Sequence, residues 1–462
     1  MAGGRGLALG FDFGTSNSAL AVVDGEGGGT GGRPRVLRLD TARPNSTLIP
    51  TLIYIEREGA VHYGYGAIEA FVRLETGREI VRKQVATTRE IDTVFGKELV
   101  RVDVDVSRPG RFFQALKSFL ADRSYGGTNV FGRPYTLEDL VALFLGEMRA
   151  RAQEQLGRSI DRVTVGRPVH YAENDPAADA LARERMVTAL AAAGFEEVSF
   201  VEEPIAAGLH YASTLDRPQT VLVFDFGGGT LDITVMRVGG GTRQVLATGG
   251  IPLGGNTLDE DVMEGRLLKY FGEDLSWGEQ GLPMPRHILD SLRRWYTIPM
   301  LNDLRIMSFL QGLGRETASK RQVRALIALI RGNHGWPLFQ EIERAKIGLS
   351  NRERETIAFF AEAIAISEPL GRREFEALIG GRVRQAARCV DGVLAAAGLE
   401  AGQIDAVLRT GGSSGIPRFQ RMLAEKFGAE KLRFQDAFVS VATGLALSAA
   451  GQTAELATAS AP

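Results

Sequence analysis

Two short segments of the chain place an aspartate directly before glycine and small hydroxyl residues. They read FDFGTSN at 11–17 and FDFGGGT at 224–230. Glycine loses more backbone entropy on folding than any other residue, so a run of glycines is expected where the main chain needs positive φ or must let a ligand approach. The N–H groups of such a turn can form a nest for an anion, and the adjacent carboxylate can hold a hydrated divalent cation. The alternative is a flexible turn with a solvated aspartate, but we interpret both segments as loops for phosphate and magnesium.

The two segments also repeat each other in their surroundings. The letters FDFG at 11–14 recur at 224–227, 213 residues further along a chain of 462. In both places an apolar run leads into the aspartate, and a second apolar run, at 18–23 and at 231–238, follows the turn. This pattern predicts a tight hairpin in each half of the chain. Two similar lobes that each offer a hairpin to a shared cleft are the simplest architecture that fits.

The composition is that of an ordinary globular protein. With 462 residues the chain is too long for one core and suits two to four subdomains. Its net charge of −2 gives no basic surface for nucleic acid or anionic membranes. The single cysteine excludes an internal disulfide, no stretch reaches the roughly 20 apolar residues of a membrane span, and the N-terminus has no secretion signal. We therefore expect a cytoplasmic monomer without nucleic-acid or membrane partners.

Strands alternate with helices along the rest of the chain, which favours an α/β fold with a mixed sheet flanked by helices. The predicted helices are 68–74, 137–156, 175–193, 205–212, 258–270, 340–350 and 439–449, and the predicted strands outside the hairpins are 48–55, 162–168, 198–203 and 404–410. Residues 272–340 are expected to form a mostly helical peripheral subdomain, in which the three tryptophans belong to the core.

Other nucleotide-binding signatures are weaker. The glycines at 27, 29 and 32 fit G-x-G-x-x-G formally, but no helix follows them, and no Walker sequence G-x-x-x-x-G-K-[ST] occurs. The turn GGSSG at 411–415 precedes a helix start, where main-chain donors and the helix dipole favour an anion, although an ordinary strand-to-helix turn fits equally. Glu343 and Lys346 share a helix face, which taken alone indicates a surface ion pair. None of these segments identifies a ligand by itself.

Together, the segments resemble the nucleotide-binding domain of the DnaK-type, 70-kDa heat-shock chaperones, which are actin-like ATPases with a ribonuclease H-like fold. Five segments carry the resemblance: two similar to the family's phosphate motifs, one to its connecting segment and two to its adenosine motifs. In chain order they are GFDFGTSNS at 10–18, EEPIAAGLHY at 202–211, FDFGGGTLD at 224–232, ERAKIGLS at 343–350 and GGSSGIP at 411–417. The match extends over about residues 7–449, and the region 272–340 is most similar to the short YegD branch.

The resemblance implies a site for ATP or ADP with Mg²⁺ and assigns roles residue by residue. Asp12 and Asp225 would hold the metal through water, and Glu203 and Thr230 would orient the attacking water. The phosphate cradle would consist of Gly14, Thr15, Ser16, Asn17, Gly227, Gly228, Gly229 and Thr230. The further nucleotide-binding residues would be Gly255, then Glu343, Lys346 and Ser350 at ribose and adenine, with Gly411, Gly412, Ser413 and Ser414 on the opposite side.

The same resemblance implies two lobes with the nucleotide cleft between them. Lobe I would comprise 1–212, with subdomain IB at about 41–112, and lobe II would comprise 213–450, with a helical subdomain IIB at about 258–355. Residues 451–462 would form a disordered tail. In the chaperones a linker and a peptide-binding domain follow, whereas the residues left here are too few for another domain. Capture of unfolded peptide by the family's usual route is therefore not expected.

The chain departs from the family pattern at three positions. The family's catalytic lysine falls on Ile68, and the sequence does not decide which other basic residue reaches the γ-phosphate. The alternatives are Arg82, Lys83 and Lys117. The two arginines that sandwich adenine in the family fall on Ile347 and Gly415. Losing cation–π stacking of about 1–2 kcal/mol on each side would weaken adenine binding roughly 5- to 30-fold per side.

Three functional hypotheses follow from the resemblance. The first is an ATP-binding, slowly hydrolysing chaperone-family protein, a weak ATPase whose lobes close on nucleotide and open to release it. The alternative is a nucleotide-gated binding module with little or no hydrolysis, which the missing lysine and arginines favour. A filament-forming actin relative or a sugar kinase on the same fold is disfavoured, because 343–350 follows the chaperone pattern. Unfolded protein or co-chaperones are the implied partners, through a surface that the sequence does not identify.

Overall fold

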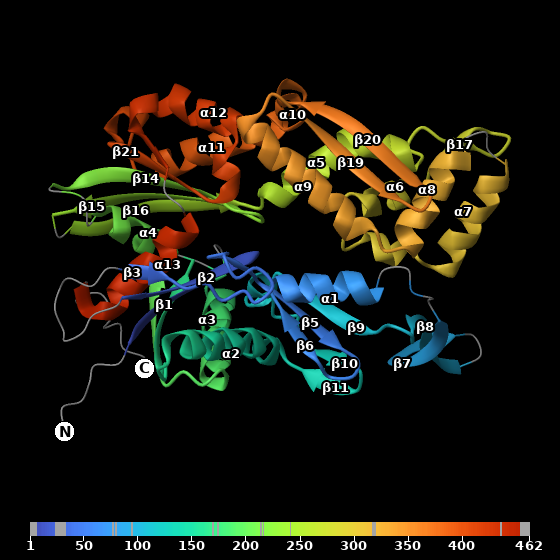
Figure 1. The fold of residues 1–462 in the computed structure, drawn as a ribbon, viewed down its shortest axis with the longest axis horizontal. Coiled ribbons are helices and arrows are strands. Elements are labelled where there is room, and N and C mark those ends of the chain that lie inside the picture. Colours follow the sequence, from blue (N-terminus) through green and yellow to red (C-terminus); the bar gives the residue numbers. More distant parts are fainter. Residues whose placement is uncertain are drawn as a thin grey trace.

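The structure is a computed structural model of the chain. It describes residues 7–23, 34–75, 78, 81–93, 96–168, 171–172, 175–212, 215, 217–240, 242–316, 320–434 and 437–452. The glycines at 27, 29 and 32 and most of the tail at 451–462 lie outside these residues, so the expected disorder of the tail stays a prediction. Figure 1 shows two bodies, with the N-terminal elements below and most of the C-terminal half above. We call the lower body the first lobe and the upper body the second lobe.

The first lobe is built on a mixed sheet with the strand order β13-β12-β1-β2-β3, and β4 pairs with β2 at one side. The strands are β1 (Ala8–Phe13), β2 (Asn17–Val23), β3 (Pro34–Val36), β4 (Ile49–Pro50), β12 (Arg162–Arg167) and β13 (Glu197–Glu202). β1 and β2 form the first predicted hairpin, and β1 runs parallel to β12. The hairpin strands are apolar along their length because helices pack on both faces of this sheet.

The second lobe repeats this topology with the order β22-β21-β14-β15-β16. Its strands are β14 (Gln219–Phe226), β15 (Leu231–Gly239), β16 (Thr242–Ile251), β21 (Ala406–Thr410) and β22 (Leu432–Phe434). β14 and β15 form the second predicted hairpin, and β14 runs parallel to β21, as β1 does to β12. The repeated FDFG letters therefore mark a repeated five-strand unit, and the predicted α/β fold of two similar lobes is confirmed.

Most predicted helices are present, with ends that differ by a few residues. Those near their predicted positions are α1 (Tyr65–Glu75), α2 (Leu137–Leu156), α3 (Pro176–Ala192), α4 (Glu203–Ala212), α9 (Gly335–Asn351) and α13 (Ala437–Leu447). A capping box fixes the start of α2, since the Thr136 hydroxyl accepts from the Asp139 N–H and the Asp139 carboxylate accepts from the Thr136 N–H.

The helix predicted at 258–270 is present as a continuous helical segment, but only its first part is an α-helix. The chain forms α5 (Gly255–Val262), the π-helical segment η2 (Met263–Leu267) and the 3-10 segment η3 (Leu268–Phe271). A Cβ at Gly265 within η2 would lie 2.4 Å from a methyl carbon of Leu378. The backbone thus passes close to a neighbouring helix at this point, and this packing overrides the simple helical period.

The region 272–340 is mostly helical, as predicted. Its elements are β17 (Ser276–Trp277), β18 (Leu282–Pro283), α6 (Arg286–Leu292), η4 (Ile298–Leu301), α7 (Leu304–Glu316) and α8 (Lys320–Arg331). Trp277 and Trp295 pack against the core of the second lobe, in agreement with their predicted place in a core. Two hairpins were not predicted: β7 (Arg82–Thr93) with β8 (Gly96–Asp105), and β19 (Arg354–Ala361) with β20 (Ile364–Gly371).

The remaining elements complete the two lobes. In the first lobe they are β5 (Leu52–Glu56), β6 (Val61–Tyr63), β9 (Gly110–Gln114), η1 (Leu116–Phe119), β10 (Thr128–Val130) and β11 (Arg133–Tyr135). In the second lobe they are α10 (Arg372–Leu378), α11 (Gly380–Ala396), η5 (Ala401–Gln403), η6 (Gly412–Gly415), α12 (Pro417–Phe427) and η7 (Ala429–Lys431), and η8 (Ser448–Gln452) follows α13. Within the described residues, no helix is long and apolar enough to cross a membrane.

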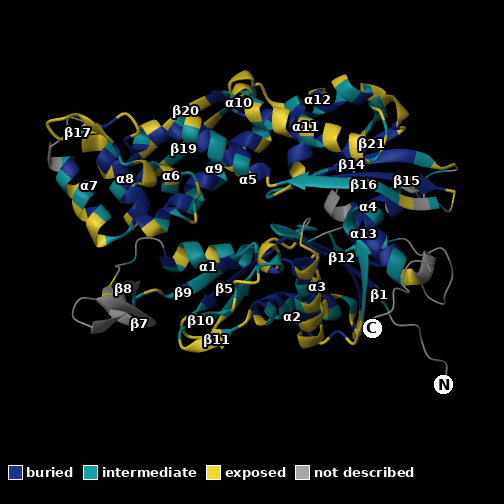
Figure 2. Ribbon diagram, turned by 180° about the vertical axis from the view of Figure 1, so that it is seen from behind, coloured by how far each residue is buried: buried dark blue, intermediate teal, exposed yellow. Residues whose placement is uncertain are grey.

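Two helices, α4 and α13, lie between the two sheets (Figure 1). α13 packs on β1 and β2, where a Cβ at Gly10 would lie 2.2 Å from the main-chain nitrogen of Ala446. The two helices also touch each other, and a Cβ at Gly444 would lie 1.9 Å from the carbonyl oxygen of Ala206. Figure 2 shows this zone among the most buried parts of the molecule. The close approach of the two backbones explains why small residues occur where α4 and α13 meet. The predicted lobe boundaries at 212 and 450 are not tested by this packing and stay predictions.

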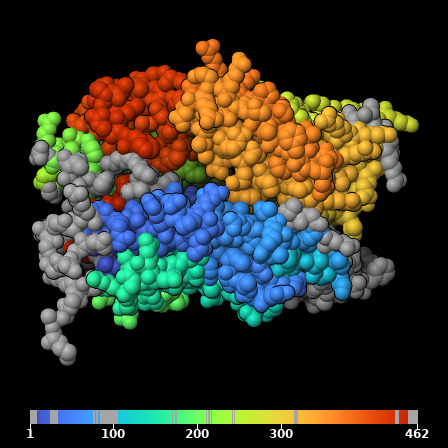
Figure 3. Space-filling view, viewed as in Figure 1, coloured from blue at the N-terminus to red at the C-terminus, as the bar shows by residue number. Residues whose placement is uncertain are grey.

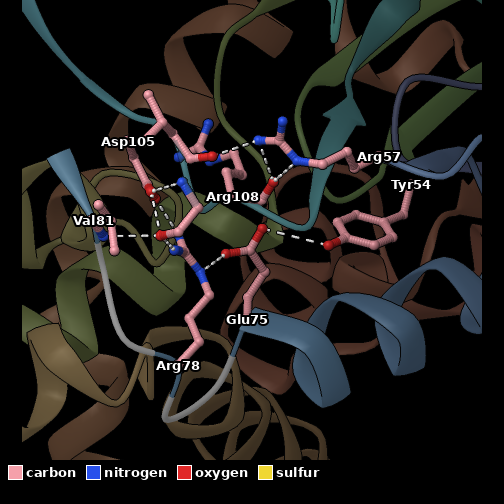
Figure 4. Close-up of polar contacts among 9 residues, drawn as sticks. Tyr54, Arg57, Glu75, Arg78, Val81, Asp105 and Arg108 are labelled. Atoms are coloured by element: carbon pink, nitrogen blue, oxygen red, sulfur yellow. Dashed lines mark hydrogen bonds and ion pairs between the residues drawn. The ribbon is translucent and has the colours of Figure 1, made fainter. Parts of the chain in front are cut away.

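Arg78 fixes the base of the β7–β8 hairpin to the end of α1 (Figure 4). Its Nε donates to Glu75 Oε2 at 2.6 Å, and its Nη2 is paired with the carboxylate of Asp105. The Ser107 hydroxyl accepts from the Val81 N–H at 2.9 Å, which closes the hairpin at its open end. Arg78 and both carboxylates are largely buried, so these charge-assisted contacts tie the base of the hairpin to the end of α1.

The two lobes also meet through aromatic rings at some distance from the sheets. Trp295 of the second lobe makes edge-to-face contacts with Phe71 on α1, at 6.1 Å between ring centroids, and with Phe112 on β9, at 5.5 Å. Trp336 also makes an edge-to-face contact with Trp295, with 4.8 Å between ring centroids. In the space-filling view the lobes accordingly meet along the seam between the orange and blue surfaces (Figure 3).

Candidate functional site

The first predicted loop is a tight turn that needs glycine at its first position. A Cβ at Gly14 would lie 2.1 Å from the carbonyl oxygen of Asn17, so a side chain there would collide with the turn itself. The carbonyl of Ser16 accepts from the Thr51 N–H at 2.9 Å. Thr51 Oγ1 in turn lies 2.8 Å from Ser18 Oγ. Thr51, which lies between β4 and β5, thus holds the turn between β1 and β2 through two hydrogen bonds.

The second predicted loop is packed against the start of α5. Gly255 donates its N–H to the Gly227 carbonyl at 3.0 Å, and Asn256 donates to the Gly228 carbonyl at 2.8 Å. A Cβ at Gly254 would lie only 2.3 Å from the Gly228 oxygen. Gly14, Gly227, Gly228 and Gly229 are not among the positive-φ residues of the described chain. Gly14 and Gly228 lie where other atoms approach closely, whereas a Cβ at Gly227 or Gly229 would meet nothing nearer than 3.9 Å. The expectation that these glycines need positive φ is wrong.

The structure brings the tips of the two loops together. A Cβ at Gly228 would lie 3.0 Å from Ser16 Oγ, and one at Gly229 would lie 4.0 Å from both Ser16 Oγ and the Thr15 methyl carbon. These residues come from opposite halves of the chain and from different sheets. Main-chain amides and hydroxyl groups of both lobes therefore face one shared space, which is what a common anion site requires.

Three carboxylates lie at this junction. Asp12 is the fifth residue of β1, Asp225 stands at the equivalent place in β14, and Glu203 opens α4. Burial and then the negative charge of Glu203 raise the pKa of the Asp12 carboxyl well above its ordinary value. Burial and then the charge of Asp232 raise the pKa of Asp225 to about 7. The group repels further negative charge and would be stabilised by a cation.

Lys117 supplies a positive charge next to these carboxylates. Its Nζ lies 2.5 Å from Glu203 Oε1, and its side chain is only 10% exposed. Burial alone would lower the pKa of the Lys117 ammonium, but the charges of Glu203 and Asp12 outweigh that effect and raise it. Room for Glu203 is left by Gly166 on β12, where a Cβ would lie 2.9 Å from Glu203 Cγ. Sequence reasoning missed the role of Gly166.

Lys346 is buried rather than exposed at the predicted adenosine side. Its Nζ lies 2.8 Å from Asp259 Oδ2 and donates to the Gly255 carbonyl at 3.1 Å. Glu343 is exposed on the same helix, so the interpretation of Glu343 and Lys346 as a surface ion pair is wrong. The partner Asp259 was not predicted. Its position one turn after Gly255, on the buried face of α5, was the available signal.

The 411–415 segment joins the second loop from the side of β21. Gly411 has φ +79°, and a Cβ there would lie 2.2 Å from the carbonyl oxygen of Phe226. Ser413 Oγ donates to the Gly227 carbonyl at 3.1 Å, while the buried Ser414 hydroxyl donates to the Gly411 carbonyl at 2.7 Å. Gly412, which follows Gly411, is the first residue of η6, and Gly415 is the last. The structure thus places this segment beside the Gly227 turn and Gly255.

Ile347 and Ser350 lie further along α9. Ile347, where the resemblance places an arginine, is 60% exposed, and Ser350 is partly exposed. Thr230, at the end of the second loop, donates its hydroxyl to Asp232 Oδ2 at 2.7 Å. The predicted site residues therefore form one group around the loop tips and a second group on α9, which the buried Lys346 connects to Gly255.

The acidic residues fit a hydrated magnesium ion. Within the described part of the chain, no three His, Cys, Asp or Glu side chains are arranged to hold a metal directly. Magnesium is commonly bound by one or two carboxylates and completed by water and phosphate oxygens. Asp12 and Asp225 supply two carboxylates whose raised pKa values reflect burial and neighbouring negative charge. A cation between them would relieve that repulsion.

Comparison with known proteins gives a consistent result. A family model described as Hsp70 protein matches residues 61–276 and 336–458. Two curated relatives, both named Chaperone protein DnaK and from two strains of Thermus thermophilus, are 28% and 27% identical over 453 residues. Each alignment covers 96% of this chain and 60% of the relative, so the chain spans about 60% of the length of these relatives.

Proposed function

The chain belongs to the Hsp70 family, and on this premise we propose that it binds ATP or ADP with Mg²⁺ between its two lobes and hydrolyses ATP slowly. The observation that carries the proposal is the meeting of the two glycine loops, at Ser16 and Gly228, beside three clustered carboxylates. The loops supply main-chain and hydroxyl donors for phosphate oxygens, and the carboxylates supply the metal side.

The loop residues would act by positioning. We propose that Asp12 and Asp225 hold Mg²⁺ through water, and that Gly14–Asn17 and Gly227–Thr230 cradle the phosphates. Bound Mg²⁺ neutralises the charge of the β- and γ-phosphates. Glu203 accepts a hydrogen bond from the water that attacks the terminal phosphate, and Thr230, whose hydroxyl is held by Asp232, flanks that water. Each charge-assisted contact contributes roughly 1.5–3 kcal/mol, so half a dozen suffice for micromolar affinity, about −8 kcal/mol.

The nucleoside side of the site is expected to be less selective. Gly255, Ser350, Glu343 and the 411–414 segment would border ribose and base, and the ammonium of Lys346 would order this border while it stays paired with Asp259. Ile347 offers an apolar surface but no guanidinium for stacking on adenine. We therefore expect ATP and GTP to bind within about tenfold of each other, which competition calorimetry can measure. A preference for ATP above about 100-fold would contradict this part of the proposal.

A chaperone-type role is the broader part of the proposal. The curated relatives are named as chaperones, and lobe closure on nucleotide would couple hydrolysis to a change in shape. Unfolded protein or co-chaperones are the expected partners. We expect the chain to act in the cytoplasm as a monomer and to be most similar to the YegD branch. The family model leaves residues 1–60, 277–335 and 459–462 unmatched, and the second of these stretches is most of the helical region 272–340.

Magnesium-dependent ATP turnover tests the proposal. We expect Asp12→Asn and Asp225→Asn each to reduce phosphate release at least about 100-fold, because either change removes one of two carboxylates at the metal. Asp290→Asn, on the exposed side of α6, is the matched control and should leave turnover unchanged. Wild-type rates in both loop variants would remove the assignment of the site.

A nucleotide switch without hydrolysis is the second candidate. It is favoured by Ile68, which occupies the family's lysine position and packs in an apolar cluster. Calorimetry with ATP and a non-hydrolysable analogue, run beside a phosphate-release assay, separates the two functions. Tight binding of both ligands without phosphate release above the blank would establish the switch, whereas steady release would exclude it.

A further inference from the structure

The position at which the family pattern has a lysine carries an uncharged, partly buried side chain in this chain. Ile68 lies on α1 and packs with Leu52, Tyr54 and neighbouring alanines in an apolar cluster. A lysine ammonium at this place would lose its hydration without gaining a partner among these side chains. The charge that the lysine would supply must come from another residue if the chain hydrolyses ATP.

Two of the three basic alternatives lie away from the loops. Arg82 and Lys83 belong to β7, which pairs with β8 in a separate two-stranded sheet. Lys83 is exposed there, opposite Val104, and the side chain of Arg82 lies outside the described part of the structure. The third alternative, Lys117, lies at the loops, because its Nζ contacts Glu203 at 2.5 Å.

The local backbone brings Lys117 to this place. β9 ends at Gln114, and Ala115 then adopts a left-handed conformation, φ 54° and ψ 31°, before η1 begins at Leu116. Non-glycine residues adopt this conformation rarely, and such strain is concentrated at functional sites. The turn directs the chain away from the β5–β9 sheet, buries Leu116 and leaves the Lys117 side chain 10% exposed. Glu203, its partner, is 86 residues away in sequence.

The charges around Lys117 also favour a functional role over a structural one. Glu203, Asp12 and Asp225 interact electrostatically with one another, and the Lys117 ammonium acts on both aspartates by lowering their pKa values against the effect of burial. A lysine that only stabilised η1 would need one carboxylate. Here one ammonium is paired with Glu203 and also interacts electrostatically with Asp12 and Asp225.

We propose that Lys117 takes over the task of the missing lysine at Ile68, as a positioning residue that holds Glu203 toward the attacking water and offsets the negative charge of the carboxylate group. The proposal rests on the proposed ATP hydrolysis. It makes Lys117 necessary for the rate of the chemical step and much less important for nucleotide affinity, since the two glycine loops supply most phosphate contacts.

Four variants test this role by kcat at saturating Mg-ATP and by Kd for ATP from calorimetry. Lys117→Met should lower kcat at least about 100-fold and change Kd less than about fivefold. Lys117→Arg, which keeps the charge, should restore kcat to within about tenfold of wild type. Lys117→Gln keeps a hydrogen-bond donor for Glu203 without the charge and should be as slow as Lys117→Met. Lys83→Met is the matched control and should behave as wild type.

Four outcomes would overturn the proposal. Wild-type kcat in Lys117→Met, with normal binding, would show that another cation performs the task. An equal loss of kcat in Lys117→Met and Lys117→Arg, with melting temperatures near wild type, would show that the positive charge does not determine the rate. A Lys117→Gln variant with kcat near wild type would show the same. If the wild-type chain binds ATP but releases no phosphate, hydrolysis and this proposal fail together, whereas turnover that survives in the Lys117 variants overturns this proposal alone.

Discussion

The two sheets have the same strand order, but the surroundings of their equivalent aspartates differ. In the first hairpin Asp12 lies opposite Ala19, and in the second Asp225 lies opposite Asp232. Lys117 acts on both aspartates, but after burial the largest effect on the pKa of Asp12 is the charge of Glu203, whereas for Asp225 it is the charge of Asp232. One repeated backbone thus presents two carboxylates in different electrostatic settings. The repeat sets where the carboxylates lie, and neighbouring residues that differ between the lobes set their charge balance.

The lobes also differ in how their lysines are held. Lys346 projects from the regular helix α9 and is paired with Asp259 on α5, while Lys117 follows a strained turn and is paired with Glu203 on α4. Asp259 keeps one oxygen, Oδ1, that is buried without a hydrogen-bond partner. The pair in the second lobe is therefore a structural joint between α5 and α9, and the pair in the first lobe lies at the loops themselves. This contrast is open to test.

The largest effect is expected at Lys346. Replacement by Met leaves Asp259 buried without its cation, and breaking a buried pair in this way costs about 3–5 kcal/mol. The measurement is the unfolding midpoint in urea at pH 7.5. The double variant Lys346→Met/Asp259→Leu should recover most of this loss, because neither charge then remains buried. A single variant as stable as wild type would show that the two pairs do not differ in the proposed way.

A smaller loss, about 3 kcal/mol, is expected for Gly10→Ala. The new methyl would meet the backbone of α13 at Ala446 and Ala442, where no flexible side chain can move aside. Its equivalent in the second hairpin is Val223, which packs among side chains, so close backbone contact distinguishes the first lobe. Thermal denaturation should show a clear decrease in midpoint.

Gly66→Ala is the control for that measurement. Gly66 lies in α1, with open space at its Cβ position, so alanine there should raise stability by about 0.5–1 kcal/mol through its helix propensity. If Gly10→Ala proved as stable as Gly66→Ala, the tight contact between β1 and α13 would not exist.

Asp225→Asn is expected to stabilise the metal-free protein at high pH. Because the folded pKa, about 7, lies above the ordinary value of 3.8, the folded state holds its proton longer than the unfolded state, and stability falls as pH rises from about 4 to 7. The shift corresponds to at most about 4 kcal/mol, and solvent screening brings the expected gain in the variant to about 2 kcal/mol at pH 8.

Melting curves in EDTA between pH 5 and pH 8 measure this gain. The variant should lose less stability over that range than wild type, and Mg²⁺ with ATP should stabilise wild type more than the variant. If stability changed with pH in the same way in both proteins, the charged form of Asp225 would not destabilise the folded state.

The loops were predictable from the sequence because their signals are local. Glycine next to aspartate in two similar runs indicated the hairpins, and the register of β1 with β2 and of β14 with β15 agrees with that pattern. The partner of Lys346 was not predictable in this way, because Asp259 is 87 residues distant and only the packing of α5 on α9 brings them together. The pairing of Lys117 with Glu203 depends likewise on tertiary structure.

Helix interruptions escaped prediction for a related reason. The segment 258–270 has apolar residues at helical spacing, but the approach of Gly265 to Leu378 favours a π-helical turn that no periodicity reveals. The hairpins β7–β8 and β19–β20 were also not predicted, and each forms a two-stranded sheet separate from the main sheets. Local signals thus located the loop residues, while long-range packing decided which charges accompany them.

The smallest effect is expected at Ala115, where the first lobe differs from the second by its strained approach to a lysine. Ala115→Gly removes a left-handed penalty of about 1–2 kcal/mol but adds about 0.5–1 kcal/mol of backbone entropy loss, so the net gain should stay below about 1 kcal/mol. Glu362→Gly, at another positive-φ residue in the turn between β19 and β20, is the control and should gain a similar amount.

If the strained turn directs Lys117, only Ala115→Gly should also lower ATP turnover, by a few-fold, because a more flexible turn holds the ammonium at Glu203 for less of the time. Unchanged turnover in Ala115→Gly would mean that η1 and the contact with Glu203 hold Lys117 without help from the turn.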